Sequence, residues 1–165
     1  MEINEITCSS AYWDSLVSLF NVSFPRNERM DSVLDGSFPF VSYFAFVEDD
    51  RFLGFLIGAQ EREIYHILYF AVEEVYRCKG NGTLALRLFL QQKEGFKIML
   101  DVEMPHEGNK DFEVRNRRIV FYKRIGFLVT DVSYRWAGED FLMLSYPSLI
   151  TRKRWAEFWD RISKG

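Results

Sequence analysis

The feature that most constrains the fold is an apolar run that leads through a glycine turn into a helix. The run IYHILYFAV (64–72) is apolar almost throughout, as expected of a strand buried on both faces of a sheet. The turn YRCKGNG (76–82) follows, and residues 82–94 are then rich in helix formers up to Gly95. KIMLDVE (97–103) alternates apolar and polar side chains, which indicates a second strand. The four pieces predict a βαβ unit with parallel strands and a right-handed crossover.

The turn YRCKGNG has two interpretations. Glycine turns between a strand and a helix are common, and most bind nothing. A turn that opens a helix also aims backbone N–H groups outward, where the helix dipole favours a phosphate or pyrophosphate. Gly80 and Gly82 allow close backbone approach or positive φ, and Asn81 tolerates the left-handed region. Arg77 and Lys79 add positive charge. The Walker and GxGxxG nucleotide motifs are absent, so the turn alone leaves both interpretations open.

Helical spacing and turn residues organise the chain before this unit. Residues 9–24 place leucines and phenylalanines at helical spacing, and Pro25 breaks the pattern. NERMDSVLD (27–35) predicts a second, short helix. Two β-rich runs that meet at the turn-forming residues 48–50 predict a hairpin.

The chain after the unit shows the same two periodicities. We expect a helix over residues 113–124 that Gly126 ends, and two strands, FLVTDVSY and DFLMLSYP, around the turn at Ala137 and Gly138. A last helix over 149–163 places Trp155, Phe158, Trp159 and Ile162 on one face. This face predicts packing on the domain or on a second subunit, so a homodimer is one of the expected arrangements.

Composition limits the classes of function. A chain of 165 residues fits one domain with one core. Its net charge of −3 gives no bulk electrostatic case for binding nucleic acid. Cys8 and Cys78 form no CxxC or Cys/His cluster, so we expect a reducing cytoplasm, no disulfide framework and no metal site. We also expect no membrane partner, because no signal-peptide core and no apolar run of the ~20 residues of a membrane helix is present.

Two motifs together resemble those of the GNAT superfamily of N-acetyltransferases. Arg77-x-x-Gly80-x-Gly82, directly before an apolar helix, is similar to the acyl-CoA-binding motif of that family. FYKRIGF (121–127) resembles its second hallmark, a helix that ends in FYxxxGF, and it follows in the family's order about forty residues later. The resemblance covers residues 1–146, which we interpret as the catalytic domain.

Two parts of the chain depart from the family pattern. Residues 147–165 lie outside the resemblance and are expected to form a helical extension. Many family members carry an asparagine seven residues before the motif tyrosine, but this chain has Arg115 there and the asparagine is Asn116. No role is therefore carried over to an asparagine.

The resemblance implies an α/β fold, α+β in some schemes, with a mixed, mostly antiparallel sheet. Its central parallel strands splay apart and helices flank it. It also implies acetyl-CoA as co-substrate, without a metal. The pantetheine would bond to the strand end and the pyrophosphate would lie on the N–H groups of the turn. The implied cofactor contacts are Phe70, Ala71, Val72, Arg77, Cys78, Lys79, Gly80, Asn81, Gly82 and Thr83.

The implied reaction is direct attack of a primary amine, on a small molecule or a peptide, on the thioester. The first alternative is an acyl-CoA-binding sensor or interaction module of the same fold without catalysis. The second is an unrelated domain that binds a nucleotide phosphate with the same turn.

Direct transfer needs a group that accepts the ammonium proton and one that supplies a proton to the leaving thiolate. The family motif makes Tyr122 the candidate acid, whereas its helical spacing alone favours a core aromatic. His66 is the candidate base, because an imidazole titrates near neutrality, and a hydrogen-bonded core histidine is the equal alternative. Glu103 and Asp101 compete with it, although a solvated strand face explains both. Cys78 lies between two cations, but direct transfer needs no covalent nucleophile.

The acceptor side is the least constrained by sequence. In the family, the acceptor side is lined by the first helices and by the loop before the closing hairpin. Glu28 could attract an ammonium group, and Arg26 or Arg29 could pair with a carboxylate, although ordinary surface charges also explain them. The candidate acceptor-binding residues are Phe24, Arg26, Glu28, Arg29, Tyr134 and Trp136.

Overall fold

The computed structural model describes all residues from 1 to 165. Its strands are β1 (Glu2–Ile6), β2 (Val41–Glu48), β3 (Arg51–Glu61), β4 (Ile64–Val72), β5 (Lys97–Glu103), β6 (Leu128–Trp136) and β7 (Glu139–Tyr146). Its helices are α1 (Trp13–Ser23), α2 (Asn81–Gln92), α3 (Phe112–Ile125) and α4 (Arg152–Lys164). Three short 3₁₀ turns are η1 (Arg26–Glu28), η2 (Asp31–Val33) and η3 (Glu74–Tyr76).

The strands follow the order β1-β2-β3-β4-β5-β7-β6. β4 and β5 are the parallel pair, and the pairs β1–β2, β2–β3, β5–β7 and β6–β7 are antiparallel. The predicted mixed α/β fold with one parallel pair is thus confirmed. Contacts along the chain define two compact units, residues 1–60 with 67–95 and residues 61–66 with 96–165.

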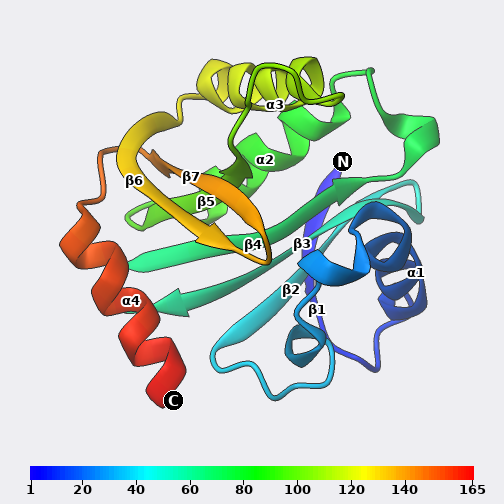
Figure 1. Cartoon of the computed structure of the whole chain (residues 1–165). Coiled ribbons are helices and arrows are strands. Elements are labelled where there is room, and N and C mark those ends of the chain that lie inside the picture. The colour runs from blue at the N-terminus through cyan, green and yellow to red at the C-terminus, as the bar shows by residue number, and fades with distance from the viewer. The chain divides into compact units, whose positions relative to one another are not determined.

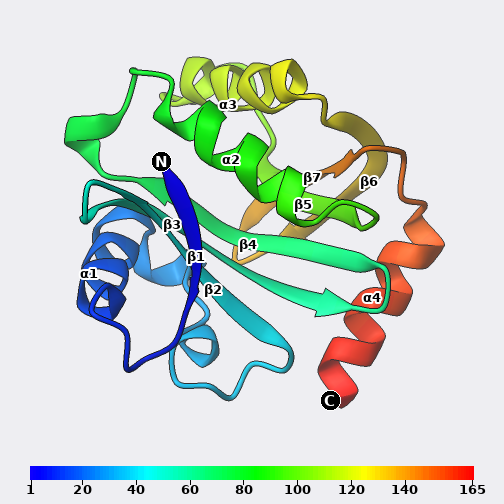
Figure 2. The ribbon, with the colours of Figure 1, turned by 180° about the vertical axis from the view of Figure 1, so that it is seen from behind.

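In the first unit, α1 and α2 cover opposite faces of β2 and β3. The ring centroid of Phe20 in α1 lies 6.3 Å from that of Phe55 in β3, and Phe89 in α2 lies 5.4 Å from Phe44 in β2. The register pairs Phe55 with Ala45, the neighbour of Phe44. Because successive side chains alternate, Phe44 and Phe55 leave the sheet on opposite faces. Figure 1 shows α1 on the near side of these strands, and the reverse view in Figure 2 brings α2 forward.

The second unit is built on the antiparallel strands β5, β7 and β6. Leu100 pairs with Leu144 in the register of β5 and β7, and both side chains are buried. The β6–β7 hairpin turns at Ala137 and Gly138, as predicted, and both residues have positive φ. α3 ends at Gly126, also as predicted. The backbone there has a φ of 121°, and the Gly126 N–H donates to the carbonyls near the end of the helix.

The helix predicted over residues 27–35 is wrong. The structure has η1 and η2 there, separated by extended backbone at Arg29 and Met30. Tyr69 of β4 explains the interruption, because its hydroxyl accepts a 2.9 Å bond from the Met30 N–H and donates a 2.9 Å bond to the Glu28 carbonyl. A tertiary contact thus replaces helical hydrogen bonds with two bonds to one side chain.

Two further features differ from the expectations at the start of the chain. β1 was not expected, because only Ile3 and Ile6 are apolar in this short run, yet it pairs antiparallel with β2. α1 begins at Trp13 and not at residue 9, since residues 7–12 form turns with bonds such as Ser10 N–H to the Thr7 carbonyl. None of the helices combines the length and hydropathy that a membrane span requires.

Candidate functional site

The predicted glycine turn of the first unit is held by the side chains of its own cations. Arg77 Nε donates to the Val72 carbonyl at 2.7 Å, and Lys79 Nζ donates to the Val75 carbonyl at 2.9 Å. Cys78 and Gly80 both lie in the left-handed region, with φ of 59° and 81°. The positive φ anticipated for the turn is therefore found at Gly80, and Cys78 adopts it instead of Asn81.

The turn leads directly into α2, whose N-terminus has no side-chain cap. Gly80 is the N-cap residue of α2, and no side chain caps the first turn. Asn81, Gly82 and Thr83 begin the helix, so their N–H groups have no acceptor within it. The Asn81 side chain points back and donates to the Tyr76 carbonyl at 2.9 Å. These N–H groups and the positive end of the helix dipole favour an anion at this position.

The strand end before the turn is closely packed on β3. Phe70 lies edge-on to Phe46, with ring centroids 5.9 Å apart, and Ala71 is buried. A Cβ atom on Gly54 would lie 2.3 Å from the Ala71 carbonyl oxygen, so only glycine allows this approach. The backbone of residues 70–72, where the family resemblance implies pantetheine contacts, is therefore packed closely against β3 within the first unit.

Tyr122 lies in the last turn of α3 and packs against Phe121 and Phe127, with ring centroids 5.1 and 5.7 Å away. Its carbonyl accepts the N–H groups of Gly126 and Phe127, which fixes the end of the helix. Burial raises the pKa of Tyr122 to about 12. The phenol therefore keeps its proton throughout the physiological range and suits a proton donor.

His66 and Asp101 form a close pair in the second unit. His66 Nε2 lies 2.6 Å from Asp101 Oδ2, and the His66 side chain is only 1% exposed. Two aromatic side chains of α4 cover the imidazole, Phe158 at 5.6 Å and Trp159 at 5.1 Å between ring centroids. His66 Nδ1 and Asp101 Oδ1 are buried without a hydrogen-bond partner. The hydrogen-bonded histidine that the sequence allowed is thus present, and the carboxylate is 13% exposed.

Tyr134 of β6 lies beside the same carboxylate. Burial, together with the negative charge of Asp101, raises the pKa of Tyr134 well above its ordinary value. The Tyr134 ring stacks on Phe141 at 5.6 Å and lies 5.2 Å from Trp155 of α4. Tyr134 also lines a pocket of about 270 Å³, and the other residues of its lining are Met104, Ser133, Arg135 and Asp140.

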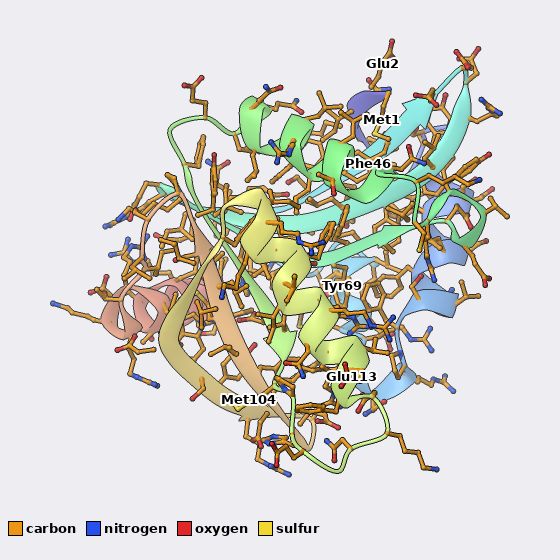
Figure 3. The ribbon with its side chains drawn as sticks, turned by 90° about the horizontal axis from the view of Figure 1, so that it is seen from above. Met1, Glu2, Phe46, Tyr69, Met104 and Glu113 are labelled. Atoms are coloured by element: carbon orange, nitrogen blue, oxygen red, sulfur yellow. The ribbon has the colours of Figure 1, made fainter.

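Glu103 is engaged differently from Asp101, although the sequence places both on one face of β5. Its carboxylate lies 3.0 Å from Arg115 Nη2 and 3.6 Å from Arg118 Nη1, and the side chain is 14% exposed. The buried Arg115 also binds Asp111, Glu139 and the Met104 carbonyl. Figure 3 labels Met104, directly after β5, and Glu113 in the first turn of α3. Arg115 thus joins β5, α3 and β7, a role that its position in the motif did not reveal.

The expected acceptor residues fall into two groups, one in each unit. In the first unit, Phe24 packs on Tyr69 at 4.9 Å between ring centroids, and Arg29 bonds to Asn21 Oδ1. Arg26 is exposed and Glu28 lies beside it in η1. Phe24 and the Glu28 carbonyl both contact Tyr69, which is labelled in Figure 3. Tyr69, whose pKa burial raises, was not predicted to lie here, because in the sequence it is one more residue of an almost wholly apolar strand.

In the second unit, Tyr134 lies at Asp101 as described, and Trp136 is 41% exposed and contacts Phe141. His106, which the motifs did not use, pairs with Asp140 at 3.1 Å. Cys78 is an exposed free thiol. No group of three or more histidine, cysteine, aspartate or glutamate side chains is arranged to hold a metal ion.

Comparisons with known proteins place this geometry in a family. The acetyltransferase (GNAT) family model matches residues 10–127. A search of curated proteins found no match. Among solved structures, an acetyltransferase of the GNAT family from Bacteroides thetaiotaomicron has a TM-score of 0.83 and 22% identity, covering 98% of this chain and 96% of its own.

Two further structures share the fold. An aminoglycoside 6′-N-acetyltransferase complexed with coenzyme A has a TM-score of 0.65 and 19% identity, covering 92% of this chain and 99% of its own. A Bacillus subtilis acetyltransferase in complex with CoA has a TM-score of 0.64 and 15% identity, covering 90% and 99%. The family match spans both predicted motifs and the elements between them. The chain therefore belongs to the acetyltransferase (GNAT) family.

Proposed function

We propose that the protein is an acetyl-CoA-dependent N-acetyltransferase that moves the acetyl group to a primary amine by direct attack. The observation that carries this proposal is the uncapped N-terminus of α2 directly after the turn Arg77-x-x-Gly80-x-Gly82. Pyrophosphate is an anion of the kind that free N–H groups and a helix dipole bind. Two structurally similar proteins were crystallised with coenzyme A, which supports acetyl-CoA as the co-substrate here.

The proposed reaction needs one group that accepts a proton from the substrate ammonium and one that donates a proton to the leaving sulfur. The ammonium of the acceptor first loses a proton, and its nitrogen lone pair then forms the C–N bond at the thioester carbonyl. The C–S bond breaks, Tyr122 gives its phenolic proton to the sulfur, and the second proton that the attacking nitrogen loses on becoming a neutral amide restores the phenol. Because the pKa of Tyr122 is raised to about 12, the proton stays on the phenol until negative charge develops on the thiolate.

The proton from the ammonium goes to the pair of Asp101 and His66. His66 is too buried to contact the substrate amine directly, whereas the carboxylate of Asp101 is partly exposed. In this proposal Asp101 receives the proton, and His66, bonded to its Oδ2, orients the carboxylate and shares the charge. Glu103, the other carboxylate considered, is a weaker candidate because Arg115 and Arg118 neutralise it.

The burial of His66 also favours a second candidate function, an acyl-CoA-binding module without catalysis. A thiol-release assay with acetyl-CoA and a panel of primary amines separates the two. We expect continuous release that needs both acetyl-CoA and an amine. Binding of acetyl-CoA without any turnover across the panel would contradict the enzyme and leave the binding module.

A further inference from the structure

We propose that Tyr134 is a positioning residue for the transfer reaction, and that it acts through Asp101 and not by direct contact with the acceptor. Its hydroxyl and the imidazole of His66 together hold the Asp101 carboxylate ionised and in one orientation, ready to receive the proton of the substrate ammonium. This inference rests on the proposed transferase function, and it adds a third member to the pair that accepts the proton.

The first argument is the register of the sheet in the second unit. Tyr134 of β6 lies opposite Phe141 of β7, and Asp101 of β5 lies opposite Met143 of β7. Residues opposite each other in an antiparallel pair leave the sheet on the same face, and so do residues two positions apart along one strand. Tyr134 and Asp101 therefore emerge on one face. The shift in the register of β6 falls before Ser133 and leaves this alignment intact.

The second argument is the hydrogen bonding of the carboxylate. A side-chain hydrogen bond joins the Tyr134 hydroxyl to Asp101, and His66 Nε2 lies 2.6 Å from Asp101 Oδ2. Burial, and then the charge of Asp101 and this bond, raise the pKa of Tyr134 well above its ordinary value. The phenol therefore keeps its proton at neutral pH and donates to the carboxylate. A donor to the charged form of a carboxyl group stabilises that form.

The third argument is the packing of the Tyr134 ring. It stacks on Phe141 with ring centroids 5.6 Å apart, and Trp155 of α4 lies 5.2 Å away. A ring that is held by two neighbours leaves its hydroxyl little freedom, so the bond to Asp101 keeps one direction. Because both the ring and the hydroxyl are engaged in this way, Tyr134 is better suited to orienting Asp101 than to binding the acceptor.

The groups around Asp101 come from several elements, and two of them bond to it, His66 of β4 and Tyr134 of β6. Glu103 leaves β5 on the same face, but it is paired with two arginines of α3. β7 and α4 present apolar and aromatic side chains to this cluster. The two bonds therefore set how readily the carboxylate takes up a proton.

The test compares Tyr134→Phe with the parent protein in the thiol-release assay, with the most active amine of the panel. The variant keeps the ring and loses the hydroxyl. We expect kcat to fall about tenfold and the KM for acetyl-CoA to stay within about twofold. The acidic limb of the kcat/KM profile should move up by about half a pH unit or more, because Asp101 then takes up a proton more readily.

Tyr146→Phe is the matched control, since Tyr146 lies at the end of β7 in the same unit and packs on Phe127. It should leave kcat and the pH profile as in the parent. An equal loss of kcat in the two variants would overturn the inference, because general loss of packing would then explain both. So would a kcat and a pH profile of Tyr134→Phe that equal those of an active parent.

A second measurement needs no turnover. Carboxyl ¹³C NMR follows the titration of Asp101, whose signal is identified by its absence from Asp101→Asn. The midpoint should lie about half a pH unit or more higher in Tyr134→Phe than in the parent, and should not move in Tyr146→Phe. An unmoved midpoint in Tyr134→Phe would overturn the inference. If the midpoint moves but the parent releases no thiol, the role of Tyr134 toward Asp101 stands and only the transferase function fails.

Discussion

At the scale of single residues, Tyr122 is the proton donor that we propose. Burial raises the pKa of its phenol to about 12. We predict that Tyr122→Phe lowers kcat about 100-fold, a loss typical for removal of a general acid, and changes the KM for acetyl-CoA little. Because the phenol is protonated at every pH below about 12, kcat should show no alkaline decline due to this group below about pH 10. An undiminished kcat in Tyr122→Phe would rule out Tyr122 as the proton donor. So would a pH profile of this variant in which kcat newly declines at alkaline pH.

Arg115 gives a second prediction at this scale. Burial opposes its charge, but hydrogen bonds to Glu139 and Asp111 and the charge of Glu103 outweigh this effect and raise its pKa. Arg115→Met should lower the free energy of unfolding by about 3 kcal/mol, because it leaves carboxylates without their cation. Arg117→Met, at an exposed arginine of the same helix, should change it by less than about 0.5 kcal/mol. Urea unfolding measures both, and equal small losses would contradict the structural role.

The surroundings of His66 show which contacts could be predicted from the sequence and which could not. A histidine inside the apolar strand IYHILYFAV required a partner, and Asp101, on the neighbouring strand, provides it. The sequence could not predict that Phe158 and Trp159 seal this pair, since they lie about ninety positions away along the chain. It predicted a solvated face for Asp101 and Glu103 because local alternation carries no information about long-range ion pairs.

At the scale of elements, the turn before α2 carries the proposed cofactor site. We predict that Gly82→Val weakens acetyl-CoA binding at least about tenfold, because a branched side chain then lies in the first helical turn where an anion must approach the N–H groups. Gly95→Val is the matched control. Gly95 follows the same helix with a φ of 91°, so this change strains the backbone without touching the turn. Calorimetry should show normal binding for Gly95→Val, and normal binding for Gly82→Val would remove the anion site.

The attachment of α4 gives an element-scale prediction about acid stability. The hydrogen bond from Arg154 lowers the pKa of Glu63 to about 2 from 4.5. A lowered folded-state pKa stabilises the fold above about pH 4.5, and this contribution disappears as the pH falls through about 2. Glu63 is half exposed, so the pair is worth less than about 1 kcal/mol.

Glu63→Gln should therefore lower Tm at pH 7 by about 1–3 °C and leave Tm at pH 2 nearly unchanged. A thermal melt followed by circular dichroism measures both values. An equal loss at the two pH values would show that the ion pair is not responsible.

Elements with strong patterns were predictable, and those decided by tertiary contacts were not. β4 and β5 match residues 64–72 and 97–103, because a continuous apolar run and a strict alternation are unambiguous. The segment 27–35 has helix-forming residues, but Tyr69 captures its backbone groups. β1 is an edge strand with few apolar residues, so only its pairing with β2 reveals it.

At the scale of the whole molecule, the order of elements and the two motifs identify the family. The parallel pair β4–β5 and the family match over residues 10–127 agree with the sequence prediction. The contacts of Tyr134 with Asp101 and Trp155 could not be predicted from the sequence, because they join residues of three separate elements. Such contacts depend on packing between distant segments and not on local periodicity.

The most direct test of the central claim is a calorimetric titration of the intact protein with acetyl-CoA, CoA and ATP. We predict that acetyl-CoA and CoA bind with dissociation constants roughly in the micromolar range, as is usual for enzyme substrates, and that ATP binds much more weakly. Binding of ATP without binding of acetyl-CoA or CoA would contradict the account, because the turn would then be a general nucleotide-phosphate site and not the cofactor site of an acetyltransferase.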